Sequence, residues 1–282
     1  MTLKKLAALS SAALIATAAA WPAQAEMTVD VGGRIQVDAA VYDDGDNNMG
    51  DGTEFRRARL FASGNIDDNW KYKLNLDFAD ADLSMKDAFI QHSSGIKIGQ
   101  FKAPFGLEEL TSSKYITFME RAMAIGVYSP SRKIGVGWGT KGDSWTFNVM
   151  GHGKEAGDST SGDEGWGGAG RLTWAAINND DMVLHFGGAV SWEEFDDSKE
   201  FRLRSRPESH NTSVRMVDTG TIEGGDYETR YGLEAAWVWN SLSLQGELLG
   251  GSTECDDECF DGGTLVVGDS FDTGGWYAYV SW

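Results

Sequence analysis

Three arginines alternate with other residues in the run Arg202-Leu-Arg204-Ser-Arg206. In an extended backbone this spacing places the three guanidinium groups on one side, roughly 7 Å apart. Like charges so close repel, so the row must be balanced by acids or by bound anions. A guanidinium suits phosphate oxygens and keeps its charge at any working pH. The row predicts an oxyanion-collecting surface; the alternative is a solvated charge run in an outer loop, paired with Glu200 and Glu208.

The two cysteines, Cys255 and Cys259, lie in a short acidic run. In an exported chain an oxidising compartment favours a small loop disulfide. A metal site is the alternative, but two thiolates among acids fall short of a four-ligand zinc set. We therefore predict a disulfide, no metal and no cofactor.

Period-2 alternation of apolar and polar residues is the main structural signal in the chain. Between Trp70 and Phe78 the apolar residues share one face and the charged residues share the other, and 29–41 repeats the pattern. About ten residues is the length that a tilted membrane strand needs. Further segments follow the same pattern: 145–150, 172–176, 182–192, 227–239 and 242–249. The pattern predicts about twelve antiparallel strands, the last at 274–282.

A transmembrane β-barrel explains this pattern better than a water-soluble sandwich, although the local alternation would look the same in both. Tight connections at 67–69, 142–144 and 178–181 alternate with long polar ones at 43–53, 154–165 and 195–226. Short turns on one side and long loops on the other are typical of an outer-membrane barrel. Aromatic residues also gather near the ends of the apolar faces, as a bilayer interface favours: Trp70, Tyr72, Trp138, Trp145, Trp192, Trp237, Trp239 and Trp276.

The alternation also assigns charged side chains to the interior of the barrel. The cations opposite the apolar faces are Arg34, Arg57, Arg59, Lys71, Lys73, Arg171 and Arg230. Facing lipid would cost each of them about 2–4 kcal/mol near the midplane, so we place them in the lumen. They either act on passing anions or pair with the lumen acids Asp38, Asp77, Asp87, Glu228 and Glu234.

The N-terminal 25 residues have the features of a cleaved signal peptide. Lys4 and Lys5 precede a run of small and apolar residues, and Ala23-Gln-Ala25 supplies the cleavage site. We expect a mature domain from residue 26 to 282. Removing two lysines and no acids changes the net charge from −19 to −21. Nucleic acid is therefore not an expected partner, because such binding depends on lysine and arginine.

Several motifs resemble the phosphate-selective porin O/P family. They are Glu54-Phe-Arg-Arg-Ala-Arg59, Ile98-Gly-Gln-Phe-Lys-Ala-Pro-Phe-Gly-Leu-Glu-Glu-Leu110, Thr111-Ser-Ser-Lys-Tyr-Ile-Thr-Phe-Met-Glu-Arg121, Ser129-Pro-Ser-Arg-Lys-Ile-Gly-Val136 and the arginine row. The resemblance implies a 16-stranded, homotrimeric anion channel of the cell outer membrane. Its third loop would fold into the lumen, and arginine rows would feed a lysine-containing constriction. The closing segment 274–282 resembles an internal strand of that family, so we expect an incomplete C-terminus; a complete twelve-stranded barrel is the alternative.

The segment from Lys102 to Arg132 is too long for a hairpin turn. Folded into the lumen, it would narrow the pore, and its hydroxyls and ammonium could replace the water around an anion. On the resemblance, Lys114 is the central charge, Ser112 and Ser113 donate hydrogen bonds, and Arg121 and Arg132 flank them. The alternative is an external loop with an exposed lysine.

Taken together, these features predict a channel for passive diffusion of small anions, with a preference for phosphate or polyphosphate-like oxyanions. The expected partners are small inorganic anions, outer-membrane lipid and two further copies of the chain. A general porin with neutralised lumen charges and a non-conducting structural or adhesive barrel are the alternatives. A barrel-embedded hydrolase would need a serine–histidine pair, and the four histidines have no nucleophile motif beside them. We therefore do not expect an enzyme.

Overall fold

The computed structural model describes residues 27–282 except 44, 46–48, 80 and 159–161. The predicted signal peptide lies outside the described residues. In the part that is described, no helix is long and apolar enough to cross a membrane.

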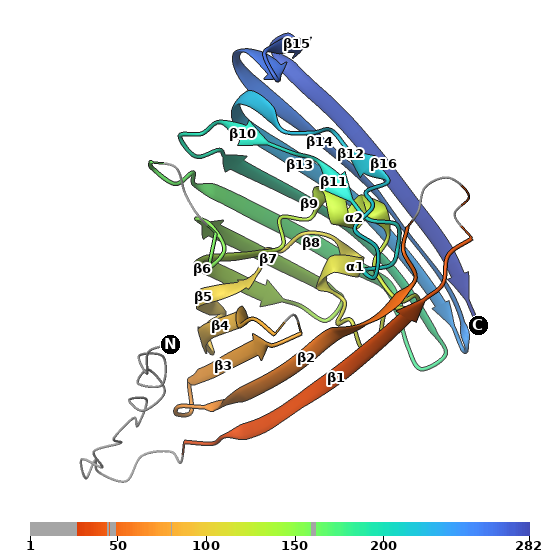
Figure 1. The fold of residues 1–282 in the computed structure, drawn as a ribbon. Helices are drawn as coiled ribbons and strands as arrows, with labels where there is room; N and C mark the ends of the chain where they lie inside the picture. Colours follow the sequence, from red (N-terminus) through yellow and green to blue (C-terminus); the bar gives the residue numbers. More distant parts are fainter. Residues whose placement is uncertain (1–26, 44, 46–48, 80, 159–161) are drawn as a thin grey trace, which may run out of the picture.

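The chain folds into one curved antiparallel sheet with each long strand beside the next (Figure 1). The long strands are β1 Asp30–Ala40, β2 Gly52–Asn65, β3 Trp70–Asp77, β4 Ser84–His92, β5 Ile96–Lys102, β6 Arg132–Lys141, β7 Trp145–His152, β8 Gly167–Asn178, β9 Met182–Glu194, β13 Ile222–Trp239, β14 Leu242–Asp261 and β16 Ser270–Ser281. The short elements are β10 Glu200–Phe201, β11 Arg204–Ser205, β12 Val217–Asp218, β15 Thr264–Val267, α1 Leu107–Leu110 and α2 Met123–Tyr128. Among the described residues, β1 pairs only with β2, and β16 pairs only with β14.

Turns and loops fall at opposite ends of the sheet, as predicted. Two- to four-residue turns join β2 to β3, β4 to β5, β6 to β7, β8 to β9 and β13 to β14. The long connections 41–51, 153–166 and 195–221 lie at the other end. β13 begins at Ile222, before the predicted start at 227, because Ile222 and Glu223 pair with β10. β14 likewise extends well beyond the predicted end at 249.

The two faces of the sheet have inverted polarity compared with a soluble sandwich. The apolar side chains of Ile35 and Trp276 are 73% and 71% exposed on the convex face. On the concave face, Arg57, Asp77 and Glu234 are buried. An outward apolar band around a polar interior is the arrangement of a membrane barrel wall. The predicted all-β, antiparallel transmembrane fold is therefore confirmed, and the sandwich alternative is excluded.

Between β5 and β6 the chain folds onto the concave side of the sheet as the inward loop, residues 103–131, which contains α1 and α2 (Figure 1). Its apolar side chains Phe105, Ile125 and Tyr128 are buried against Leu249 of β14. The loop therefore crosses the interior from the β5–β6 wall to the opposite wall.

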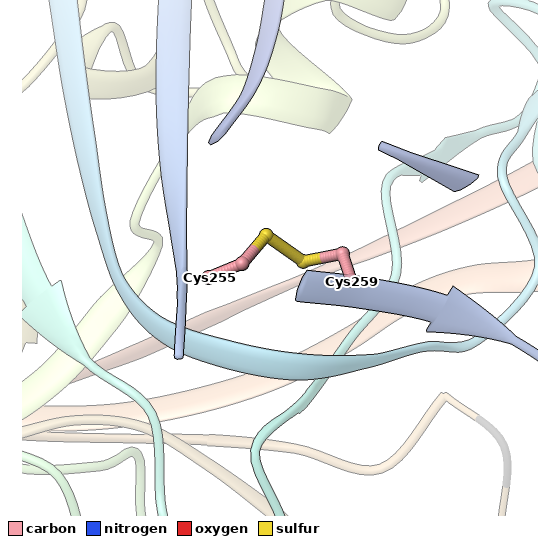
Figure 2. Close-up of a disulfide and its surroundings, with 2 residues drawn as sticks. All are labelled: Cys255 and Cys259. Atoms are coloured by element: carbon pink, nitrogen blue, oxygen red, sulfur yellow. A yellow bond between two sulfur atoms is a disulfide. The ribbon is translucent and has the colours of Figure 1, made fainter. Parts of the chain in front are cut away.

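A disulfide joins Cys255 and Cys259 near the loop end of β14, with 5.6 Å between their Cα atoms (Figure 2). Cys259 is fully buried in a cluster with Phe201 and Ile222. The thiols are consumed by this bond, and no group of three or more metal-ligating side chains occurs in the described residues.

Candidate functional site: a cationic constriction

The first residues of the inward loop's helix α1 are hydrogen-bonded to a carboxylate on the opposite wall. The backbone N–H groups of Leu107 and Glu108, at the start of α1, donate to Glu247 of β14 at 2.9 and 2.8 Å. Gly106 precedes them with φ of 74°, a conformation that glycine adopts without strain. The Tyr277 hydroxyl donates to the same carboxylate at 2.5 Å. Glu247 therefore satisfies backbone donors that a four-residue helix cannot satisfy internally.

Arg121 holds the inward loop together. Its guanidinium donates to the carbonyl oxygens of Glu108 and Thr111, both at 2.8 Å, and lies 3.4 Å from the Glu109 carboxylate. The sequence prediction placed Arg121 beside the constriction; in the structure most of its hydrogen bonds go to the backbone of the inward loop.

A β-bulge in β2 turns two neighbouring arginines toward the inward loop. Gln36 pairs with Arg57 and Val37 with Phe55, so Arg56 is an extra residue without a partner in β1. Arg56 and Arg57 both donate to the Glu120 carboxylate of the loop. Burial raises the pKa of Glu120, but the hydrogen bonds and charges of these arginines outweigh it and lower the pKa overall. Glu120 is therefore an ionised anchor that ties the loop to the β1–β2 wall.

A second β-bulge interrupts the pairing of β4 with β3. Asn75 pairs with Asp87 and Leu76 with Met85, so Lys86 is the extra residue. Asp87 then accepts ion pairs from Lys73 at 3.1 Å and from Arg132 at 3.0 Å. Bulges commonly re-aim side chains in this way.

Beneath the inward loop lies a cavity of about 370 Å³. We call it the constriction cavity. Its charged and hydroxyl lining residues are Arg59, Lys73, Asp87, Lys97, Lys102, Ser112, Ser113, Arg121 and Arg132. Six of these side chains are cationic, and Asp87 is the only carboxylate among them.

Three carboxylates pair with these cations, so positive charge remains. Arg59 pairs with Asp77 at 2.7 Å and Lys102 with Glu109 at 2.8 Å, while Lys73 and Arg132 share Asp87.

Lys97 has no carboxylate within ion-pair distance among the described residues. Its ammonium lies 4.6 Å and 4.9 Å from the ring centroids of Phe89 and Phe101. The rings attract this charge without neutralising it.

The hydroxyl residues and Arg34 complete this side of the interior. Arg34 of β1 donates to the Ser113 Oγ at 2.5 Å, which leaves the hydroxyl proton of Ser113 available to donate. Arg34 itself forms no ion pair in the described part of the chain. Ser112 and Ser113 both line the constriction cavity.

Lys114 lies apart from the cavity lining. Its side chain is exposed, and its ammonium is 5.6 Å from the ring centroid of the neighbouring Tyr115. The structure thus places the two serines, but not Lys114, against the constriction cavity.

The arginine row alternates as predicted but does not carry three equal charges. Arg202 and Arg204 are exposed, while Leu203 and Ser205 are buried. Arg202 forms a two-pronged pair with Asp218 at 2.7 and 2.6 Å. These hydrogen bonds lower the pKa of the Asp218 carboxyl to about 2, so the pair persists at any working pH.

A second cavity of about 270 Å³ is lined by four arginines and three glutamates: Arg121, Arg204, Arg206, Arg215, Glu109, Glu120 and Glu208. Burial and the charges of Arg206 and Arg204 lower the pKa of Arg215. Arg215 lies outside the alternating row, and nothing in the sequence pattern distinguishes it.

Lys71 lies at the turn end of the sheet, away from the constriction. It lines a separate polar cavity of about 770 Å³ with Lys141 and His92. It is therefore a lumen residue at the opposite mouth.

The remaining lumen cations are paired with wall acids. Arg171 binds Glu234, which also contacts His185 at 2.7 Å. Arg230 binds Glu228 at 2.6 Å and Glu193 at 3.3 Å.

Sequence reasoning missed four cations near the constriction. Arg56 and Lys86 occupy bulges, which interrupt the period-2 pattern. Lys97 alternates with Ile96 and Ile98, so its inward position could have been read from the sequence. Lys102 was named only as the first residue of the predicted loop and not as a residue of the constriction.

Residues 29–282 match the family described as phosphate-selective porin O and P. Porin O of Pseudomonas aeruginosa is 28% identical over 272 residues, which cover 83% of this chain and 61% of that protein. An uncharacterized protein of Caulobacter vibrioides is 28% identical over 224 residues, covering 73% of this chain and 45% of its own. The chain thus spans about half the length of the curated relatives that it matches.

Two solved outer-membrane proteins align at low similarity. The trimer form of OmpT of Vibrio cholerae has a TM-score of 0.38 at 12% identity, with 90% of this chain and 83% of that chain covered. The outer membrane channel DcaP of Acinetobacter baumannii has a TM-score of 0.38 at 14% identity, with 93% and 99% covered. Since the family match extends over nearly all described residues, the chain belongs to the phosphate-selective porin O and P family of the outer membrane.

Proposed function

We propose that the protein forms an outer-membrane channel for passive diffusion of small anions, with a preference for phosphate or polyphosphate-like oxyanions. The observation that carries this proposal is the constriction cavity, where six cationic side chains meet three carboxylates. Transport of this kind needs no covalent chemistry.

Two cationic regions would act in sequence on an entering anion. Arg204, Arg206 and Arg215 would collect it at the loop end of the sheet, since guanidinium groups match oxyanion geometry. Lys97 and the hydroxyls of Ser112 and Ser113 would then replace part of its water in the constriction. Arg121 lines both cavities and so joins the two steps.

The net charge of −19 does not oppose this proposal. An ion responds to the local field in the constriction rather than to the charge of the whole chain. Asp43, Asp51, Asp256 and Glu258 are exposed at the loop end of the sheet, where cations from solution can balance them.

We also propose a homotrimer in contact with outer-membrane lipid. The family resemblance implies three copies, and the exposed apolar band of this chain suits lipid or a neighbouring copy. The predicted incomplete C-terminus of domain 26–282 stays a prediction.

A general, weakly selective porin is the second candidate. The pairing of Arg171 and Arg230 with wall acids favours it, because paired charges exert little net field.

Planar-bilayer recording of the full-length protein in a KCl gradient separates the two candidates. We expect the current to reverse near the chloride potential. A weak or cation-leaning reversal would contradict the anion preference.

The variant Lys114→Glu tests the residue that the family resemblance implies as the central charge. If Lys114 contributes to the constriction in the full-length protein, the variant will abolish or reverse the anion preference. An unchanged reversal potential would remove Lys114 from the site and leave Lys97 as the charge to test.

A further inference from the structure

The connection between β9 and β13, residues 195–221, is the crossing loop, and it carries the arginine row. The end of the crossing loop that contains β10 is fixed to strand β13. Phe201 pairs with Ile222 across β10 and β13, and both pack in the buried cluster that contains the Cys255–Cys259 disulfide.

The far end of the crossing loop contacts the β1–β2 hairpin, more than 150 residues away in sequence. Tyr42 Oη and Ser209 Oγ are 2.6 Å apart, and Asn211 donates to the Gly52 carbonyl at 3.1 Å. Between them, His210 Nδ1 lies 2.7 Å from the Glu54 carboxylate. Three consecutive residues therefore bind one hairpin.

The middle of the crossing loop lies against the inward loop. Glu208 accepts a hydrogen bond from the Met123 N–H at 3.2 Å. A Cβ built on Gly126 of α2 would lie 2.5 Å from Ser205 Oγ, so a larger residue there would displace the Ser205 side chain. Arg204 and Arg206 are consequently held between the disulfide cluster on one side and the His210–Glu54 contact on the other.

We propose that Glu54 and His210 form a latch that positions the arginine row over the constriction, so that they determine oxyanion capture without binding the anion themselves. This inference rests on the proposed anion channel. His210 lines the second cavity with Arg121, Arg204, Arg206 and Arg215. The charge of Glu54 beside that cavity is itself unfavourable to an anion, which argues for a structural purpose. Thr212, next to the latch, is only 1% exposed, so the tip of the loop is packed rather than projecting into solvent.

The variant Glu54→Ala, which removes both the charge and the acceptor oxygen, distinguishes positioning from a simple field effect. Removing the negative charge that contacts His210, a lining residue of the cavity of Arg204, Arg206 and Arg215, would tighten phosphate binding through the field alone. Loss of the latch instead predicts weaker phosphate binding, because the freed crossing loop must be ordered again each time an anion binds. We expect the phosphate concentration that half-blocks the chloride current to rise about 3- to 10-fold.

His210 offers a matched pair of substitutions. His210→Ala removes the contact and should weaken block as Glu54→Ala does. His210→Asn places an amide N–H where Nδ1 stands, and it should restore near-normal block. Glu223→Gln is the control, since Glu223 is an exposed acid at the same end of the sheet with no role in the latch.

All variants are recorded as full-length protein in planar bilayers, with phosphate titrated into KCl. Weaker block in Glu54→Ala and His210→Ala, with rescue by His210→Asn and no change in Glu223→Gln, would support the latch. Tighter or unchanged block in Glu54→Ala, while the parent protein remains phosphate-sensitive, would overturn the latch alone. Absence of phosphate block in the parent protein would instead contradict the proposed function.

Discussion

The two sides of the interior wall differ in how fully their cations are paired with carboxylates. On the β1–β6 side, Arg34 and Lys97 have no carboxylate partner in the described residues, and Arg132 shares Asp87 with Lys73. On the β8–β14 side the cations are matched by acids, as in the Arg171–Glu234 pair. The first side can exert a field on a passing ion, whereas the second mainly satisfies its own buried charges.

Backbone irregularity contributes to this difference. A regular strand sends every second residue outward, which limits inward charges to one in two. The bulges at Arg56 and Lys86 each add one more cation to the interior. Both of these extra cations lie on the β1–β6 side, and the inward loop is anchored to the same wall through Glu120.

The largest expected effect on ion selectivity comes from reversing the charge of a cation without a carboxylate partner on the β1–β6 side. Lys97→Glu changes the local charge by two units, and at a separation of roughly 7 Å in a watery lumen this is worth about 1.2 kcal/mol. We expect the chloride-to-potassium permeability ratio to fall about 5- to 10-fold.

The control for Lys97→Glu is the double variant Arg171→Gln with Glu234→Gln, which removes a matched pair from the other side. Reversal potentials in a KCl gradient measure both. Equal shifts in the two proteins would contradict the distinction between the walls.

On the β8–β14 side, we expect Glu247 to hold the inward loop in place. Glu247→Ala leaves the N–H groups of Leu107 and Glu108 and the Tyr277 hydroxyl without their acceptor, a loss of about 1–3 kcal/mol. We expect higher single-channel conductance and faster proteolysis of residues 103–131. Glu247→Gln keeps one acceptor oxygen and should show a smaller change; identical behaviour of the two variants would argue against this anchor.

The smallest expected effect concerns Glu108. Burial, and then the nearby Glu247 carboxylate, raise the pKa of Glu108 despite the hydrogen bond from the Ala122 N–H. The folded loop thus binds this proton more tightly than the unfolded chain, so its stability falls as pH rises above the ordinary glutamate range.

Glu108→Gln should slightly raise resistance of the inward loop to proteolysis at pH 7.5 and leave it nearly unchanged at pH 4.5. The same protection in parent and variant at both pH values would contradict this assignment.

Period-2 alternation was sufficient to predict the strands and the lumen face, because burial of one face strictly fixes the register. The inward loop was instead implied by the length of segment 102–132 and by the family resemblance. Alternation could not predict the bulges, since Arg56 and Arg57 cannot both face inward in a regular strand. Nor could spacing reveal that Arg202 is neutralised by Asp218, or that Arg215 joins the row, because both depend on how a long loop folds.

The central claim is that unmatched positive charge beneath the inward loop binds oxyanions. The most direct test is to titrate phosphate into KCl while recording chloride current through single channels of the full-length protein. Saturable block at low phosphate, lost in Lys97→Glu and kept in the Arg171→Gln, Glu234→Gln protein, is the predicted result. A chloride current that phosphate does not block in the parent protein, or that it blocks equally in both variants, would contradict this claim.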